Sequence, residues 1–209
     1  MSSELITAIE THQKAFGLEL AEEALAGLGR FYAMVQEHNA LLHLVGPCTT
    51  EEFAVRHVLE SLTMLEHLPE RARFADVGSG AGLPALPCLI VRADLRAVLI
   101  ESKEKKAGFL RTAIAECGIG ERAEVIAQQF SEAPRPDVSY VSCRALDKFS
   151  RHLPKLLKWS GDRTLLFFGG PALGEEMRRH KLKFEEKLMP MSEQRYLFVV
   201  RRKRGSAMY

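Results

Sequence analysis

Apolar residues recur at helical rather than strand spacing over residues 1 to about 70. They predict three helices, the last of which begins near Thr50, a possible N-cap, after a break at Gly46-Pro47. We therefore expect residues 1–70 to form an N-terminal helical extension without strands.

From residue 71 onward, short apolar runs alternate with helix-compatible stretches. The runs predict strands over 74–77, 96–101, 124–127, 137–143 and 164–168, with helices over 83–92, 103–116, 149–159 and 174–180. Two last runs, 184–189 and 195–201, are joined by a link too short for a parallel crossover, so they must pair antiparallel. Residues 71–209 should thus form an α/β domain whose mostly parallel sheet ends in an antiparallel strand.

The composition is ordinary for a globular protein, and a formal net charge of +2 does not by itself indicate a nucleic-acid partner. Basic residues do cluster at 103–106, 178–181 and 201–204. Such clusters are usually solvated faces, so they permit an RNA partner without requiring one.

Four cysteines lie far apart and form no C-x-x-C pair. We expect buried thiols, no metal site and no disulfide, as in a reducing cytoplasm. No apolar stretch approaches membrane-spanning length and the first residues do not resemble a signal peptide, so we expect a cytoplasmic protein without a membrane partner.

The stretch 75–84, Ala-Asp-Val-Gly-Ser-Gly-Ala-Gly-Leu-Pro, follows an apolar run and carries three glycines at alternate positions. It predicts the first strand-to-helix turn of a doubly wound sheet, where a ligand can lie against main-chain N–H groups. A tight turn without a ligand is the alternative. The next strand ends on Glu101, about 20 residues later, where an acid that binds ribose is expected. Together the two features favour a nucleotide-like ligand.

The glycine spacing also bears on which nucleotide is bound. A dinucleotide site would have its third glycine at position 83, where this chain has Leu83. Asp76, two residues before the first glycine, could accept hydrogen bonds from the turn or from an ammonium group. This pattern resembles the S-adenosylmethionine site of Rossmann-like methyltransferases; a nucleotide-dependent oxidoreductase is the alternative.

Ligands of open parallel sheets lie at the carboxyl ends of the strands. We expect the turn with Gly78, Gly80 and Leu83 to hold the methionine portion, Glu101 the ribose hydroxyls, and Gln129 with Phe130 the adenine. Arg144 ends an apolar strand, and a charge there favours a polar cleft over the alternative of a surface ion pair.

His57 follows Arg56 on the last predicted helix of the extension. Glu60 lies one turn later, so that Arg56 and Glu60 can pair at i, i+4. The spacing leaves open whether His57 is a packing residue or faces a substrate. We assign no residue as an acid or base catalyst; the candidates for positioning are Arg144, Ser102 and His57.

Several motifs together resemble the RsmG (GidB) family, bacterial methyltransferases that act on guanine N7 of small-subunit ribosomal RNA. They are Asn39 with Leu44, the helix 55–61 (Val-Arg-His-Val-Leu-Glu-Ser), the glycine stretch with Pro87, Leu99–Ser102 with Lys105, Lys106, Phe109 and Leu110, Ser142–Ala145, and Arg195. The resemblance spans nearly the whole chain.

The resemblance implies a Rossmann-like methyltransferase sheet, S-adenosylmethionine as the cofactor, and 16S ribosomal RNA or a ribosomal particle as the partner. We expect the protein itself to be a monomer. It also implies that Arg144 and Ser102 position the cofactor or base, and that Arg56, His57 and basic C-terminal residues contact RNA phosphates.

Two departures from the family pattern bear on activity. Gln128-Gln129-Phe130 replaces an arginine, a small residue and an acid, and Gly169-Gly170 replaces Lys-Gly. Loss of that lysine could weaken RNA docking or transfer its role to Lys148, Lys155 or Arg195. A non-catalytic protein that binds RNA or the ribosome is therefore a further alternative.

Overall fold

The computed structural model describes residues 2–144 and 149–201. Lys148, named above as a candidate for RNA docking, and the basic residues 202–204 lie outside the described residues.

The first third of the chain is helical, as predicted. Its elements are α1 (Ser2–His12), the 3₁₀-helix η1 (Gln13–Phe16), α2 (Glu22–Leu42), α3 (Thr50–Glu52), η2 (Phe53–Leu59), α4 (Glu60–Leu62) and the 3₁₀-helix η3 (Thr63–His67). The expected N-cap at Thr50 is wrong by one residue, because Thr49 forms a capping box with Glu52, in which each side chain accepts a hydrogen bond from the other's backbone N–H.

The helix around His57 also differs from the prediction. Phe53–Leu59 forms a π-helix rather than an α-helix, and the Glu60 amide donates to the carbonyl of Val55. The predicted pair between Arg56 and Glu60 is wrong: Arg56 pairs with Glu52 at 3.0 Å, whereas Glu60 turns into the protein. The wider π turn changes which residues face each other, and tertiary partners of Glu60 replace the local one.

Seven strands follow in one sheet. They are β1 (Arg73–Val77), β2 (Arg96–Ile100), β3 (Ala123–Ile126), β4 (Tyr140–Arg144), β5 (Thr164–Gly169), β6 (Glu185–Leu188) and β7 (Tyr196–Val200). Their order is β3-β2-β1-β4-β5-β7-β6. The pairs among β1 to β5 are parallel, and β7 is antiparallel to both β5 and β6. This confirms the predicted mostly parallel sheet with an antiparallel C-terminal strand.

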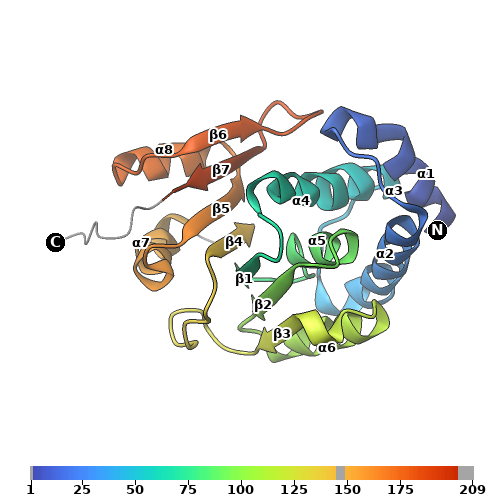
Figure 1. Cartoon of the computed structure of the whole chain (residues 1–209), viewed down its shortest axis with the longest axis horizontal. Coiled ribbons are helices and arrows are strands. Elements are labelled where there is room, and N and C mark those ends of the chain that lie inside the picture. The colour runs from blue at the N-terminus through green and yellow to red at the C-terminus, as the bar shows by residue number, and fades with distance from the viewer. Residues whose placement is uncertain (1, 145–148, 202–209) are drawn as a thin grey trace.

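Helices cover both faces of the sheet (Figure 1). The connecting elements are α5 (Ala85–Val91), α6 (Glu104–Glu116), the 3₁₀-helix η4 (Gly120–Arg122), α7 (Phe149–Ser160) and α8 (Pro171–Arg179). In the view of Figure 1, α5, α6 and the N-terminal helices lie to the right of the sheet and α7 and α8 to the left. No described helix combines the length and apolar character needed to cross a membrane.

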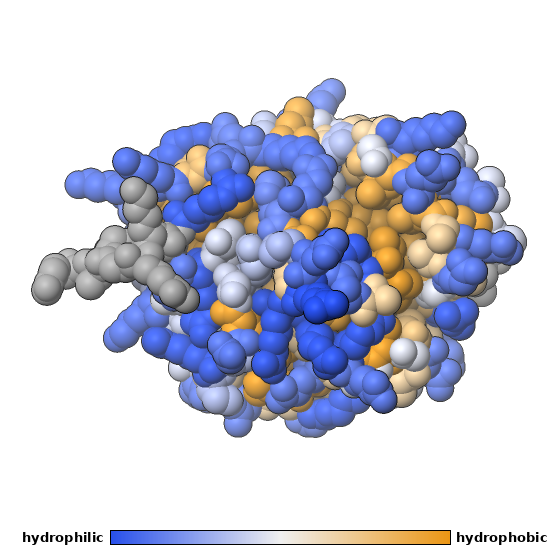
Figure 2. Space-filling view, in the orientation of Figure 1, coloured by the Kyte–Doolittle hydropathy of each residue, from blue (hydrophilic) through white to orange (hydrophobic). Residues whose placement is uncertain are grey.

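Each sheet face has its own hydrophobic core, because side chains alternate along a strand. Phe74 of β1 lies in the same core as Phe31 and Phe53 of the N-terminal helices, whereas Val77 of β1 lies in the core of the other face with Trp159 of α7. The N-terminal helices and the sheet therefore share one core. Figure 2 shows a mostly hydrophilic surface on the viewed side, with apolar atoms gathered near α5 and α2.

The predicted burial of the cysteines is partly confirmed. Cys88 and Cys143 are buried, whereas Cys48 and Cys117 are partly exposed.

Candidate active site

A cavity of about 400 Å³ opens at the carboxyl ends of β1, β2 and β4. It unites most of the residues singled out in the sequence: Gly78, Gly80, Leu83, Glu101, Ser102, Arg144 and His57. Further lining comes from Leu44, Val45, Gly46, Ser79, Ala81, Lys103 and Lys106. The N-terminal helices thus supply one wall of this cavity and the sheet supplies the other.

The glycine turn has the backbone conformation that its sequence predicts. Gly78 and Gly80 have φ values of 73° and 54°, in the left-handed region that favours glycine. The Gly78 amide donates to the carbonyl of Ile100 at 2.8 Å, which anchors the turn to β2. Leu83 follows as a largely buried apolar wall.

Glu101 reaches across from the end of β2 to this turn. Its Oε2 accepts a hydrogen bond from the Gly80 amide at 2.9 Å, and its Oε1 accepts one from the Lys103 amide at 2.8 Å. The Ser102 hydroxyl lies 3.5 Å from Oε1. These contacts fix the carboxylate beside the cavity, where it can accept hydrogen bonds from a ligand.

Asp76 lies at the base of the turn and is fully buried. Its Oδ1 accepts a hydrogen bond from the Ser142 hydroxyl at 2.7 Å, and its Oδ2 is buried without a partner among the described residues. Burial raises the pKa of Asp76 to about 7, although the hydrogen bond from Ser142 opposes the shift. Asp76 does not line the cavity, so its unpartnered oxygen can act on a bound cationic group only from beneath the turn.

Arg144 lines the cavity, as a charge in a polar cleft would, and its ion pair is with the buried Glu60 rather than the surface pair that was the alternative. Its Nη2 donates to the Arg56 carbonyl at 2.5 Å and lies 3.5 Å from Glu60, and its Nη1 donates to the Ser61 hydroxyl at 3.2 Å. The guanidinium also stands 5.7 Å from the centre of the Phe168 ring, a cation–π contact.

His57 is likewise a packing residue that lines the cavity. Its ring packs edge-on against Phe53, and its Nδ1 is buried with no hydrogen-bond partner within residues 2–144 and 149–201. Burial, helped by the charges of Arg144 and Arg56, lowers the pKa of His57 to about 4. His57 is therefore neutral near pH 7 and does not supply the cation expected there for RNA phosphate.

Gln129 and Phe130 are not brought into the cavity. The Phe130 ring is buried in the second core, edge-on to Trp159 with 6.3 Å between ring centres. Gln129 is exposed, and its carbonyl accepts hydrogen bonds from the amides of Glu132 and Ala133. Both residues follow β3 at the edge of the sheet where ligands bind, as predicted. The Phe130 ring nevertheless packs against Trp159 in the core and not against the cavity.

The sequence interpretation missed two parts of the wall. One is the loop 44–46, held in place because Asn39 Oδ1 accepts hydrogen bonds from the amides of Leu44 and Val45. The other is Lys103 with Lys106, whose Nζ donates to the His43 carbonyl at 2.9 Å. The Gly46-Pro47 break marked the loop, but nothing in its pattern placed it opposite the glycine turn.

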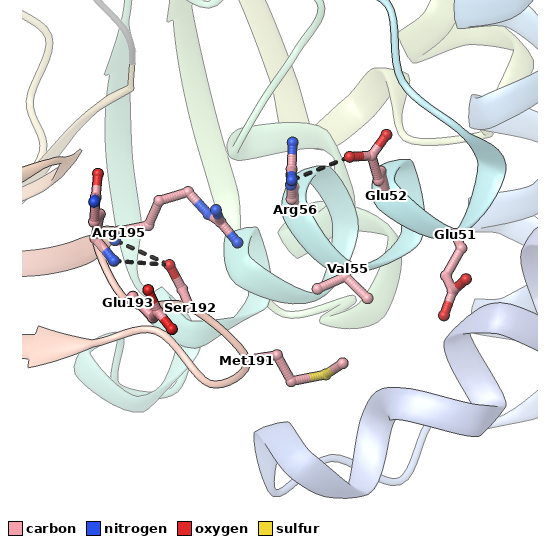
Figure 3. A pocket seen from close by; sticks show the side chains of 9 residues that line it. Glu51, Glu52, Val55, Arg56, Met191, Ser192, Glu193 and Arg195 are labelled. Carbon is pink, nitrogen blue, oxygen red and sulfur yellow. Dashed lines mark hydrogen bonds and ion pairs between the residues drawn. The ribbon is translucent and has the colours of Figure 1, made fainter.

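A second groove of about 410 Å³ lies between the start of the π-helix and the link from β6 to β7. It is lined by Glu51, Glu52, Val55, Arg56 and residues 191–195. Figure 3 shows Arg195 extending from this link toward the helix that carries Arg56. Its guanidinium Nε lies 2.6 Å from Oε1 of Glu60.

Comparison with known proteins shows the family. Residues 24–203 match the family model GidB, described as rRNA small subunit methyltransferase G. "Ribosomal RNA small subunit methyltransferase G" of Nitrosospira multiformis is 42% identical over 113 residues, which are 54% of this chain and 51% of the relative. The protein of that name from Desulfotalea psychrophila is 31% identical over 158 residues, 73% of this chain and 72% of the relative.

The matched part of the chain thus spans about half the length of the first of these relatives. Among solved structures, a SAM dependent methyltransferase from Aquifex aeolicus superposes with a TM-score of 0.53 at 17% identity, covering 67% of this chain and 88% of that one. This likeness confirms the predicted Rossmann-like methyltransferase fold. Because the family model matches residues 24–203 and the Desulfotalea psychrophila relative is 31% identical over 73% of this chain, the chain belongs to the GidB family of rRNA small subunit methyltransferase G proteins.

Proposed function

We propose that this protein transfers a methyl group from S-adenosylmethionine to N7 of a guanine in small-subunit (16S) ribosomal RNA. The observation that carries the proposal is the two-sided cavity. The glycine turn, Glu101 and Arg144 line it from the sheet, and His57 lines it from the N-terminal helices. The names of the relatives and the resemblance noted in the sequence support the choice of substrate.

The residues of the turn fit the cofactor. The Gly78–Gly80 backbone would hold the methionine portion, Glu101 the ribose hydroxyls, and the unpartnered Oδ2 of Asp76 would favour the ammonium group. S-adenosylmethionine, when bound, supplies a methyl group on a positively charged sulfur. Contacts with adenine by Gln129 remain part of the proposal, whereas Phe130 serves the core.

The neutral state of His57 suits this chemistry. Guanine N7 carries a free lone pair at neutral pH, so its methylation requires no general base, and a nearby acid would compete for that lone pair. His57, with its pKa lowered to about 4, does not donate a proton at pH 7. Arg144 would orient the base, while Leu83 and Val45 exclude water from the reacting atoms.

Cations at the rim would contact RNA phosphates. Lys103 and Lys106 border the cavity, and Arg56 and Arg195 border the second groove. Phosphate contacts of this kind orient an RNA without reading its sequence. One of these cations, Arg195, was named above as a residue that could take over the role of the lysine missing at Gly169-Gly170.

The proposed function gives each part of the chain a role. We propose residues 1–70 as an extension that walls the cavity on the substrate side, and 71–209 as the methyltransferase domain. We also propose that the protein acts in the cytoplasm as a monomer.

Labelled methyl transfer tests the function. The protein is incubated with methyl-labelled S-adenosylmethionine and either naked ribosomal RNA or small-subunit particles from a strain that lacks it, and the modified base is mapped. We expect label at N7 of one guanine of 16S RNA. Label at another atom would contradict the proposed acceptor, and RNA binding without label would indicate the non-catalytic alternative. NADH fluorescence on mixing with the protein tests the oxidoreductase alternative.

A further inference from the structure

Glu60 is a buried carboxylate shared by two arginines from distant parts of the chain. Its side chain is only 2% exposed. Oε1 lies 2.6 Å from Nε of Arg195, on the link between β6 and β7, and Oε2 lies 3.5 Å from Nη2 of Arg144, at the end of β4. The carboxylate thus connects the cavity to the second groove.

The same helical segment supplies the other acceptors of Arg144. The Arg56 carbonyl and the Ser61 hydroxyl both accept from its guanidinium. Arg144 therefore takes its orientation from residues 56–61, rather than from its own strand. The π turn just before Glu60 belongs to this arrangement, and such turns are frequent at functional sites.

The two guanidinium groups are the charged partners of the buried Glu60 carboxylate. Burial raises the pKa of Glu60 above its ordinary value, and the hydrogen bond from Arg195 and the charge of Arg144 offset only part of that shift. A buried carboxylate with two guanidinium partners gives each of them a fixed anchor, which a neutral side chain of the same shape does not provide.

We propose that Glu60 is a positioning residue for methyl transfer: it holds the Arg144 guanidinium against the cavity wall and, through Arg195, fixes the link between β6 and β7 beside the second groove. This inference rests on the proposed function. Glu60 does not line the cavity, so it acts on a bound base through Arg144. Loss of its charge should lower kcat, while the glycine turn and Glu101 continue to bind the cofactor.

The test compares Glu60→Gln with Glu60→Asp and with a matched control, Glu66→Gln. Glu66 of η3 pairs at 2.6 Å with Lys187 of β6, so the control also removes an ion pair between the N-terminal helices and the C-terminal strands. We expect E60Q to lower kcat about tenfold or more. KM for RNA and the calorimetric Kd for S-adenosylmethionine should each change by less than about threefold. E60D, which keeps the charge, should recover part of kcat, and E66Q should match wild type.

A kcat for E60Q equal to wild type would overturn the inference. So would a loss of kcat that is matched by an equal loss of cofactor affinity. If E60Q does not fold, Arg144→Met and the double variant Glu60→Gln/Arg144→Met replace it, since the double variant leaves no unpaired partner at position 144. Equal kcat for these two variants supports action through Arg144, whereas a further loss in the double variant contradicts it.

A structural readout separates this inference from the proposed function. Modification of Arg144 by phenylglyoxal, mapped by mass spectrometry, should become several times faster in E60Q, less so in E60D, and not in E66Q. An unchanged rate would show that Glu60 does not hold Arg144, whether or not the protein methylates RNA. Absence of methyl transfer by the wild type, with faster modification in the variant, would contradict only the proposed function.

Discussion

The Glu101 carboxylate accepts a hydrogen bond from the Gly80 amide, with 2.9 Å between Oε2 and the nitrogen. This contact joins the end of β2 to the turn after β1, so the two groups expected to bind the cofactor form a single preorganised edge. Variants that disturb one group should therefore affect ligand binding more than they affect folding.

Gly80→Ala tests the turn. Gly80 has a φ of 54°, where an alanine costs about 1–2 kcal/mol, and among the described residues beyond its chain neighbours the new methyl would meet only the Gly78 carbonyl within 4 Å. We expect the calorimetric affinity for S-adenosylmethionine to fall about tenfold or more.

Gly118→Ala is the matched control, because Gly118 has a φ of 68° and an added Cβ would meet no atom of the described residues beyond its chain neighbours within 4 Å. It should lose similar stability in thermal unfolding and retain normal affinity. Equal affinities for the two variants would remove the turn from the cofactor site.

Phe130→Leu distinguishes a core role from an adenine contact. The Phe130 ring is buried against Trp159, so we expect the free energy of unfolding to fall by about 1–2 kcal/mol. Affinity for S-adenosylmethionine should be unchanged, because the ring does not line the cavity. Denaturant titration and calorimetry measure the two effects. A loss of affinity without a loss of stability would restore the adenine role.

Asp76 should make cofactor binding depend on pH. Its pKa, raised to about 7, means that the carboxylate becomes charged as the pH rises through 7, and a charged carboxylate attracts the cofactor ammonium more strongly. Affinity measured at pH 6 and at pH 7, a range in which the α-ammonium of the cofactor stays protonated, should therefore be higher at pH 7. The Asp76→Asn variant should bind S-adenosylmethionine with equal affinity at the two pH values. If its affinity still depended on pH, the dependence would come from a group other than Asp76.

His57 should make the stability of the fold depend on pH in a lower range, between pH 4 and 6.5. Its pKa falls from 6.5 to about 4 on folding, so the unfolded chain binds more protons between these values. Stability contributed by the neutral ring is complete above pH 6.5 and is lost as the pH falls toward 4, by up to about 3 kcal/mol. Because Asp76 titrates with the opposite sign, the measurement is the difference between wild type and His57→Phe across this range. If the stability difference between wild type and His57→Phe did not change with pH, the lowered pKa of His57 would be contradicted.

The parts of the site that were predicted from the sequence are those whose positions are determined by neighbouring residues in the chain or by the order of the strands. Gly78, Gly80 and Glu101 follow strands whose apolar runs are easy to recognise, and parallel pairing then brings them together. The same logic placed Arg144 correctly at the end of β4.

The remaining features depend on packing between distant segments. The pair predicted for Arg56 and Glu60 assumed an α-helix and an exposed face, whereas a π turn and the guanidinium groups of Arg144 and Arg195 determine where Glu60 points. Phe130 has the chemistry of an adenine cover, but Trp159, about thirty residues later in the chain, decides where its ring lies.

The common core of the N-terminal helices and the sheet makes the chain one cooperative folding unit. Phe31 and Phe53 are fully buried together with Phe74 of β1, so a chain cut at residue 70 would expose apolar surface on both fragments and favour their aggregation. A ligand that contacts both His57 and the glycine turn binds only the intact fold. Its binding energy is consequently added to the stability of the whole molecule, and a shift in melting temperature would report occupancy of the cavity.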